Sequence, residues 1–229
     1  MSNVSQFGHR LVQIAITVLL VILSASVHEF GHAVVAYRLG DDTAKRQGRL
    51  TLNPLSHIDT FGSLVLPLLM GLAGGPVFAF AKPVPYNPNK LRNPRRDEVL
   101  VAFAGPATNI LQACFGAIMA NLIWRFSLQD IVSGGMAYWA YVVASTYVYV
   151  NCTLAFFNLI PLPPLDGSSI VSPLLKGEAR RKYYVVQQYS LPILMILLYV
   201  LPGFIGFDPL GVYLDATAGN LANILLGWA

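Results

Sequence analysis

The chain has 229 residues, of which 55% are hydrophobic and only 11% are charged. Soluble domains carry about 25% charged residues, so this composition excludes an ordinary soluble protein and predicts an integral membrane protein. The formal net charge of +4 comes largely from lysines and arginines in connecting segments. It therefore bears on membrane topology, and we expect no nucleic-acid partner.

The first apolar run, at about 11–39, predicts a membrane-spanning helix that contains the string His-Glu-Phe-Gly-His. Ionisable groups are costly in hydrocarbon, so residues of this kind inside a span mark a functional site by default. His28 and His32 are four residues apart and share one helix face, where two imidazoles can hold one tetrahedral Zn²⁺. Glu29, beside the first histidine, is then the candidate general base.

The next apolar segment, 61–81, is interrupted by glycines and prolines and makes a poor spanning helix. Its flanks, the expected loops 40–60 and 82–98, are both rich in basic residues, and so is the later segment 161–188, which we also expect to be a loop. If 61–81 enters the membrane and returns, all three basic segments share one face, as the positive-inside bias requires. We therefore expect a re-entrant element with both flanks in the cytoplasm.

Re-entrant backbone is tolerated only beside protein or a water-filled cavity, so we expect 61–81 to lie against the active site. The stretches 49–52 and 76–80 look extended and predict a small membrane-embedded sheet there. An exposed edge of this sheet could capture an unwound substrate by strand addition.

Further apolar runs predict spans at 99–124, 137–160 and 189–206, while the weaker run 209–228 predicts a short or interfacial helix. The expected fold class is an all-α polytopic membrane protein. It would have about five to six membrane segments, a three-helix catalytic core and the small re-entrant element. We expect one domain over 1–229, with a core at about 11–170 and accessory C-terminal helices at 189–228.

Zinc hydrolases commonly use three protein ligands and leave one position open for water. The best third ligand is Asp166, which follows the proline-rich end of the third core span. Prolines cannot continue the helix, and the Asp-Gly pair predicts a turn that returns the acid toward the membrane. Asp166 would thereby reach the depth of His28 and His32.

These patterns together resemble the site-2 protease family of intramembrane zinc metalloproteases. The resemblance rests on the histidine motif at 28–32 and on the stretch from Asn158 to Gly167. The stretches 105–109, 53–59 and 81–85 also resemble motifs of the family's compact prokaryotic branch, without a PDZ or CBS domain. The resemblance implies three core helices around the metal, and implies a prokaryotic inner or plasma membrane location.

Three further polar residues are site candidates. Asn109 and Asn158 lie in apolar spans, where asparagines either join helices or, as the resemblance implies, hold the substrate backbone near the zinc. An amide N–H could also stabilise the oxyanion of the tetrahedral intermediate. His57 is a metal-proximal group, a gate or a structural histidine of the Asn53-Pro54 turn, and we favour a supporting role.

The predicted function is zinc-dependent cleavage of transmembrane segments of other membrane proteins. The partners would then be a transmembrane protein substrate and the lipid bilayer, with the active site nearer the cytoplasmic side. The alternative is a non-proteolytic zinc-binding scaffold or chaperone, against which the intact Glu29 argues. A transporter with buried ionisable groups would predict an inverted repeat, and the two metal motifs are not repeats of each other.

Overall fold

A computed structural model describes residues 3–59, 65 and 82–227 of the chain. Every regular element in these ranges is helical, which confirms the expected all-α membrane fold. Most of the predicted re-entrant segment, including 76–80, lies outside the described residues. The stretch 49–52, also expected to be extended, is irregular and bent instead of forming a strand.

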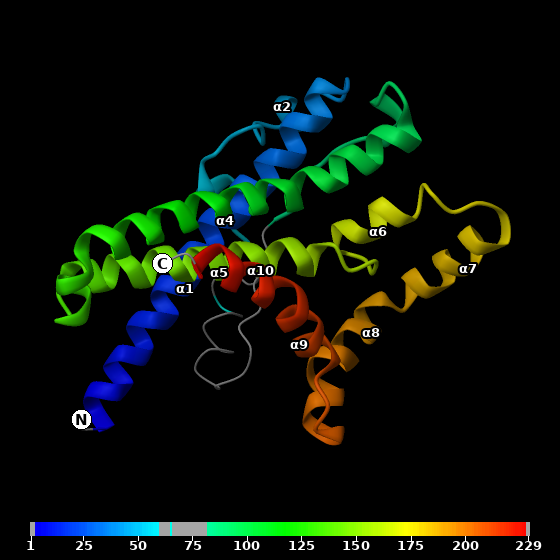
Figure 1. Ribbon diagram of the computed structural model, residues 1–229. Helices are drawn as coiled ribbons and strands as arrows, with labels where there is room; N and C mark the ends of the chain where they lie inside the picture. Colours follow the sequence, from blue (N-terminus) through cyan, green and yellow to red (C-terminus); the bar gives the residue numbers. More distant parts are fainter. Residues whose placement is uncertain (1–2, 60–64, 66–81, 228–229) are drawn as a thin grey trace.

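Three long helices form the frame of the molecule: α1 (Asn3–Arg38), α4 (Pro94–Val132) and α5 (Met136–Asn158). They contain the predicted core spans. Figure 1 shows α4 and α5 side by side with α1 crossing them. A short turn joins α4 to α5, and the two helices run antiparallel. The turn contains Gly134 at φ +75°, a left-handed conformation that favours glycine.

The contact between α4 and α5 is built from small side chains. Ala113 and Ala117 of α4 face Val148 and Cys152 of α5, and all four are buried. Small residues let helix backbones approach closely, which is the usual basis of packing inside membranes, where burial of apolar surface drives little association. The sequence thus places its smallest residues where the helices meet.

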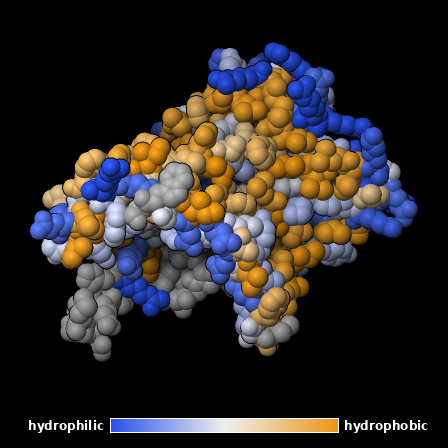
Figure 2. All heavy atoms as spheres, in the orientation of Figure 1, coloured by the Kyte–Doolittle hydropathy of each residue, from blue (hydrophilic) through white to orange (hydrophobic). Residues whose placement is uncertain are grey.

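The opposite face of α4 is covered by large apolar side chains that point outward. Leu111, Phe115, Ile118 and Leu122 are spaced by three and four residues and are all exposed. Figure 2 shows hydrophobic surface over much of the visible face of the molecule. Exposed apolar surface of this extent is expected of helices that contact lipid, as the composition indicates.

The two flanks of the segment 60–81 meet at the Arg38 end of α1. The backbone N–H of Lys82 donates to the carbonyl of His57 at 2.9 Å. The ammonium of Lys90 pairs with Asp42 at 3.1 Å. The flanks also contain three short elements, α2 (Thr43–Arg46), η1 (Pro54–Ser56) and η3 (Pro88–Lys90). Both flanks therefore lie together, as a re-entrant arrangement requires.

The segment 161–188, expected to be a loop, contains two helices, α6 (Asp166–Val171) and α7 (Gly177–Gln188). The predicted span at 189–206 is not one regular helix, because α8 (Ser190–Met195) passes into the π-helical η4 (Ile196–Ile205). The helix pair 177–188 and 192–204 is bent by 67°. The described residues thus hold three helices long and apolar enough to span a membrane, or four if this bent pair is one span.

The C-terminal segment packs against the frame. It forms α9 (Pro209–Leu214), the π-helical η5 (Asp215–Gly219) and α10 (Asn220–Leu226). Ala218 and Ala222 join the small-residue cluster between α4 and α5. The side chain of Asn121 on α4 donates to the carbonyl of Leu225 at 3.1 Å. The accessory helices predicted at 189–228 therefore include one that supports the core.

Candidate metal centre

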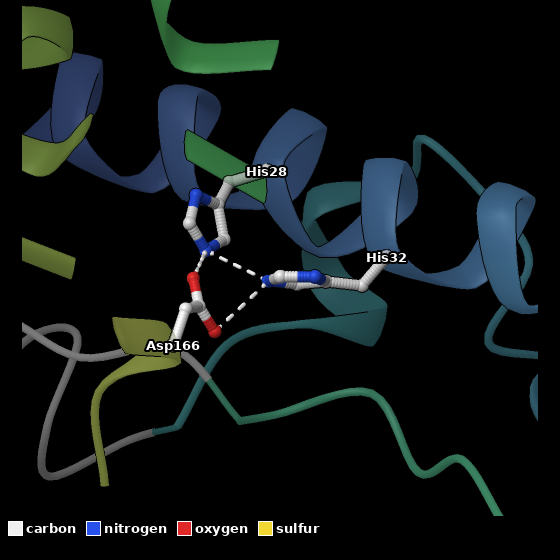
Figure 3. Close-up of side chains that lie close together, drawn as sticks. All are labelled: His28, His32 and Asp166. Atoms are coloured by element: carbon white, nitrogen blue, oxygen red, sulfur yellow. Dashed lines mark hydrogen bonds and ion pairs between the residues drawn. The ribbon is translucent and has the colours of Figure 1, made fainter. Parts of the chain in front are cut away.

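Two histidines of α1 form one side of the candidate site. The i, i+4 spacing places His28 and His32 on the same face, and both are buried. Their Nε2 atoms lie 3.0 Å apart, and Figure 3 shows both rings directed toward the same point. The sequence spacing thus produces two nitrogen donors that converge.

Asp166 approaches this point from the N-terminus of α6. Its Oδ2 lies 3.1 Å from Nε2 of His28, and its Oδ1 lies 3.3 Å from Nε2 of His32 (Figure 3). The chain folds back tightly to reach this position. A Cβ atom at Gly167 would stand 2.3 Å from the carbonyl oxygen of Leu159, so the turn needs glycine there. The Asp-Gly turn therefore places the carboxylate of Asp166 beside the two imidazoles.

The three donors fit a tetrahedral zinc site. With bonds of about 2.0–2.1 Å, neighbouring ligand atoms around Zn²⁺ are about 3.3 Å apart. The two Nε2 atoms are 3.0 Å apart, and each lies 3.1 or 3.3 Å from a different oxygen of Asp166. Asp166 Oδ2 is buried and makes no hydrogen bond within the described part of the chain, despite its proximity to His28. A cation among these atoms would satisfy that oxygen.

Helix α4 forms the wall behind the two imidazoles at Gly105. A Cβ atom there would stand 2.4 Å from Nε2 of His32 and 2.5 Å from Nε2 of His28. Gly31, inside the histidine motif, makes a similar approach, since its Cβ would meet the Thr108 side chain at 2.7 Å. The crossing of α1 and α4 at the site therefore depends on two glycines.

The second ring nitrogen of each histidine also has a partner on α4. Nδ1 of His32 lies 2.7 Å from the carbonyl oxygen of Val101, which can only accept. Nδ1 of His28 bonds to Oδ1 of Asn109. If both Nδ1 atoms donate, both Nε2 atoms present lone pairs to the donor cluster. Such contacts usually fix the orientation and tautomer of metal-binding histidines.

The charge state of Asp166 also suits a ligand. Burial acts to raise the pKa of its carboxyl group, but when the imidazoles of His32 and His28 are protonated they outweigh burial and hold that pKa below its usual range. The carboxyl group is therefore ionised at neutral pH, as metal coordination requires.

Glu29 is adjacent to the donors but is not one of them. Its Oε2 accepts a hydrogen bond of 2.7 Å from the backbone N–H of Val84. Val84 lies between Pro83 and Pro85, and proline has no N–H. In this stretch the Val84 amide therefore donates to Glu29, while its two neighbours have no N–H to donate. The contact holds the carboxylate beside the site.

His57 lies in the loop next to the Lys82 flank and not among the three clustered metal donors of the described chain. Its side chain is buried, and Nε2 is 2.9 Å from the carbonyl oxygen of Thr51. Its own carbonyl accepts from Lys82. These contacts suit the supporting role that the sequence favours.

The two candidate asparagines differ. Asn109 is fully buried, with Oδ1 bonded to His28 and Nδ2 donating to Asn151 at 2.9 Å. An oxyanion role would require one of these bonds to break. Asn158 donates to the carbonyl of Leu154 in its own helix at 3.0 Å, and its role in substrate binding stays a prediction.

Several residues around the site were not singled out by the sequence. Val101 and Val84 contribute only backbone groups, which no side-chain pattern reveals. Asn151 and Ser24 are polar residues inside apolar runs, and only this feature of the sequence could have marked them as residues near the site. Each becomes informative only once the packing of the helices is known.

The fold and the site define a helical membrane protein in which two histidines and an aspartate form a candidate metal centre beside a glutamate. The chain belongs to Peptidase family M50, whose model matches residues 15–201. It is 37% identical to "Putative zinc metalloprotease YwhC" of Bacillus subtilis over 185 residues, which is 81% of this chain and 80% of the relative.

A second relative is "Putative zinc metalloprotease Rip2" of Mycolicibacterium smegmatis, 28% identical over 218 residues, or 90% of this chain and 79% of the relative. Rip2 of Mycobacterium tuberculosis is 30% identical over 182 residues, 77% of this chain and 63% of the relative. No solved structure matches the chain. The family and these names support a zinc metalloprotease, with Zn²⁺ as the cofactor.

Proposed function

We propose that this protein is an intramembrane endopeptidase that cleaves transmembrane segments of other membrane proteins. In this proposal His28, His32 and Asp166 hold the zinc and Glu29 is the general base. The observation that carries it is the convergence of two imidazoles on the apolar helix α1 with the carboxylate of Asp166 from α6, with one ligand atom of each within 4.8 Å of the others. Such a set of groups is costly in hydrocarbon unless it binds a metal.

The chemistry follows from the positions of the chain's own groups. When bound, Zn²⁺ supplies the Lewis acid that activates water and polarises the scissile carbonyl. Glu29 accepts a proton from the attacking water and passes it to the leaving amine. Its bond to the Val84 N–H keeps the carboxylate in place beside the donors. A helical substrate must unwind locally, because its peptide bonds are otherwise shielded by the helix.

The proposal extends to location and topology. We place the active site nearer the cytoplasmic face of a prokaryotic inner membrane, because the basic residues gather at the Arg38 end of α1. His28 lies ten residues before Arg38, or about 15 Å along the helix axis. The site would thus be inside the bilayer yet close to one surface.

Two substitutions test the function together. Glu29→Gln should retain about one zinc per chain and lose cleavage of a model transmembrane substrate by about 100-fold or more, because only the base is removed. Asp166→Ala should lose tight zinc binding as well as activity. Zinc content and cleavage would be measured on the same purified samples.

The outcomes separate an enzyme from a scaffold. Near-native cleavage by Glu29→Gln would rule out the general-base assignment. Full, tight zinc occupancy in Asp166→Ala would remove Asp166 from the site. A native protein that holds zinc but cleaves no membrane substrate would favour the non-proteolytic scaffold or chaperone.

A further inference from the structure

A chain of buried hydrogen bonds runs behind His28 through all three long helices. It begins at Nδ1 of His28 and passes to Oδ1 of Asn109 on α4. Nδ2 of Asn109 donates to Oδ1 of Asn151 on α5 at 2.9 Å, and Nδ2 of Asn151 donates to Oγ of Ser24 at 2.9 Å. The last three side chains are completely buried. Ser24 lies one helical turn before His28 on α1, so the chain returns to the helix from which it started.

The two histidines differ in what fixes their tautomers. The partner of His32 Nδ1 is the backbone carbonyl of Val101, which can only accept a proton. The partner of His28 Nδ1 is a carboxamide, which can accept through its oxygen or donate through its nitrogen. If the Asn109 amide were turned over, its nitrogen would face Nδ1 and favour a proton on Nε2, the atom that faces the other donors. Only a further contact can hold the amide in the useful orientation.

Asn151 supplies that contact. Its Oδ1 accepts from Asn109 Nδ2. Its own Nδ2 donates to the carbonyl of Tyr147, which can only accept and so fixes this orientation, and also to Ser24 Oγ, both at 2.9 Å. Every donor in the chain thus points away from His28 and every acceptor points toward it. The direction of the chain leaves the lone pair of His28 Nε2 on the metal side.

We infer that Asn151 and Ser24 are positioning residues that set the tautomer of His28 through Asn109 and thereby set the affinity for zinc. This inference rests on the proposed role of His28 as a ligand. Asparagines between membrane helices also stabilise packing, and such a role would depend on hydrogen bonds being made, whatever their direction. The inference depends on direction, which gives it a distinct test.

The test measures zinc affinity by competition with a chelator on the purified full-length protein. Asn151→Leu should weaken zinc binding by about 10-fold to 100-fold, the usual range for loss of such a supporting contact. Ser24→Ala, a smaller change, should weaken it in the same direction by less. Asn121→Leu is the matched control, since Asn121 also lies on a long helix and bonds across to Leu225 but is not in the chain. It should leave zinc affinity unchanged.

Asn109→Asp is the decisive variant. Both oxygens of a carboxylate accept, so either orientation of the side chain keeps the proton on Nδ1 of His28. The outer oxygen of this carboxylate would face the acceptor Oδ1 of Asn151, so the comparison is made in the Asn151→Leu background. There Asn109→Asp should restore zinc affinity to within a few-fold of the native protein, while Asn109→Leu loses it. In the double variant Asn109→Asp with Asn151→Leu, the second change should cost little, because the orientation it controls no longer exists.

Equal losses from Asn151→Leu in both backgrounds, or native affinity in Asn151→Leu alone, would overturn the inference. His28→Ala separates this failure from failure of the proposed site. Loss of zinc in His28→Ala with native affinity in Asn151→Leu would remove only the positioning role. Native zinc affinity in His28→Ala would overturn the ligand assignment and the inference with it.

Discussion

Gly105 sets how closely α4 can approach the candidate metal donors. The Cβ atom of an alanine there would stand within 2.5 Å of Nε2 of both His28 and His32. Neither side can move away easily, because the imidazoles are held by Asn109 and Val101, which belong to the same helix as Gly105.

We therefore expect Gly105→Ala to lower zinc affinity by about 100-fold or more, although alanine is the better helix former. Gly8→Ala is the matched control, because a Cβ atom at Gly8 on α1 would meet nothing within 4 Å. Zinc titration of both variants would check the prediction. Equal affinities in the two would show that the helices part at Gly105 without cost.

The residue scale also shows what the sequence can reveal. His28 and His32 were predicted to lie together because their spacing alone puts them on one face of a helix. Asp166 was predicted from local chemistry, since prolines and an Asp-Gly pair specify a turn. The partnership of Asn109 with Asn151 was not predictable, because it depends on how α4 and α5 are rotated against each other, and no local spacing records that rotation.

At the scale of elements, the proline-flanked stretch beside α1 holds Glu29 through a single backbone N–H. Val84→Pro removes that donor, whereas Val84→Ala keeps it and shortens the side chain. We expect Val84→Pro to lower the rate of substrate cleavage about 10-fold or more relative to Val84→Ala, because the general base is then less well placed.

Zinc content should be unchanged in both Val84 variants, since Glu29 is outside the set of three donors. Cleavage of a model transmembrane substrate and zinc content would be measured side by side. Equal rates in the two variants would show that the Val84 contact does not position the base. Loss of zinc in Val84→Pro alone would indicate wider damage to the site.

Element prediction succeeded where the apolar pattern was long and unbroken. The three core spans follow from long apolar runs, and each lies within one continuous helical stretch, because the kink of α4 at Ser127 falls beyond the run 99–124. The run 189–206 contains Pro192 and Pro202, which lack the N–H that a regular helix needs. The structure places a π-helical stretch over Pro202. A hydropathy pattern does not reveal this irregularity. The segment 161–188 reads as a loop in the sequence because its helices, α6 and α7, are short and largely polar.

For the whole molecule, the contacts between the two flanks of 60–81 predict that both flanks lie on the same side of the membrane. Lys82 bonds to His57 and Lys90 pairs with Asp42, so the flanks cannot be on opposite sides of a bilayer. Gln47→Cys and Asn89→Cys, each in a background without Cys114 and Cys152, should therefore react with an impermeant thiol reagent from the same side. That side should be the cytoplasm.

Ser133→Cys provides the control for this labelling, because Ser133 lies in the turn at the far end of α4. It should react only from the side opposite to Gln47→Cys. Labelling of Gln47→Cys and Asn89→Cys from different sides would require a single crossing between them. The flanking contacts of the structure would then be incorrect.

The hydrogen-bond chain that ends at Ser24 has a consequence for how the protein is made. The two histidines emerge from the ribosome early, but Asn109, Asn151 and Asp166 follow in that order along the chain. A nascent chain that has inserted only its first helix has neither the carboxylate donor nor the amides that orient His28. In the proposed site, zinc would therefore be captured late in biogenesis, only after the third core helix has docked and the Asp-Gly turn has closed.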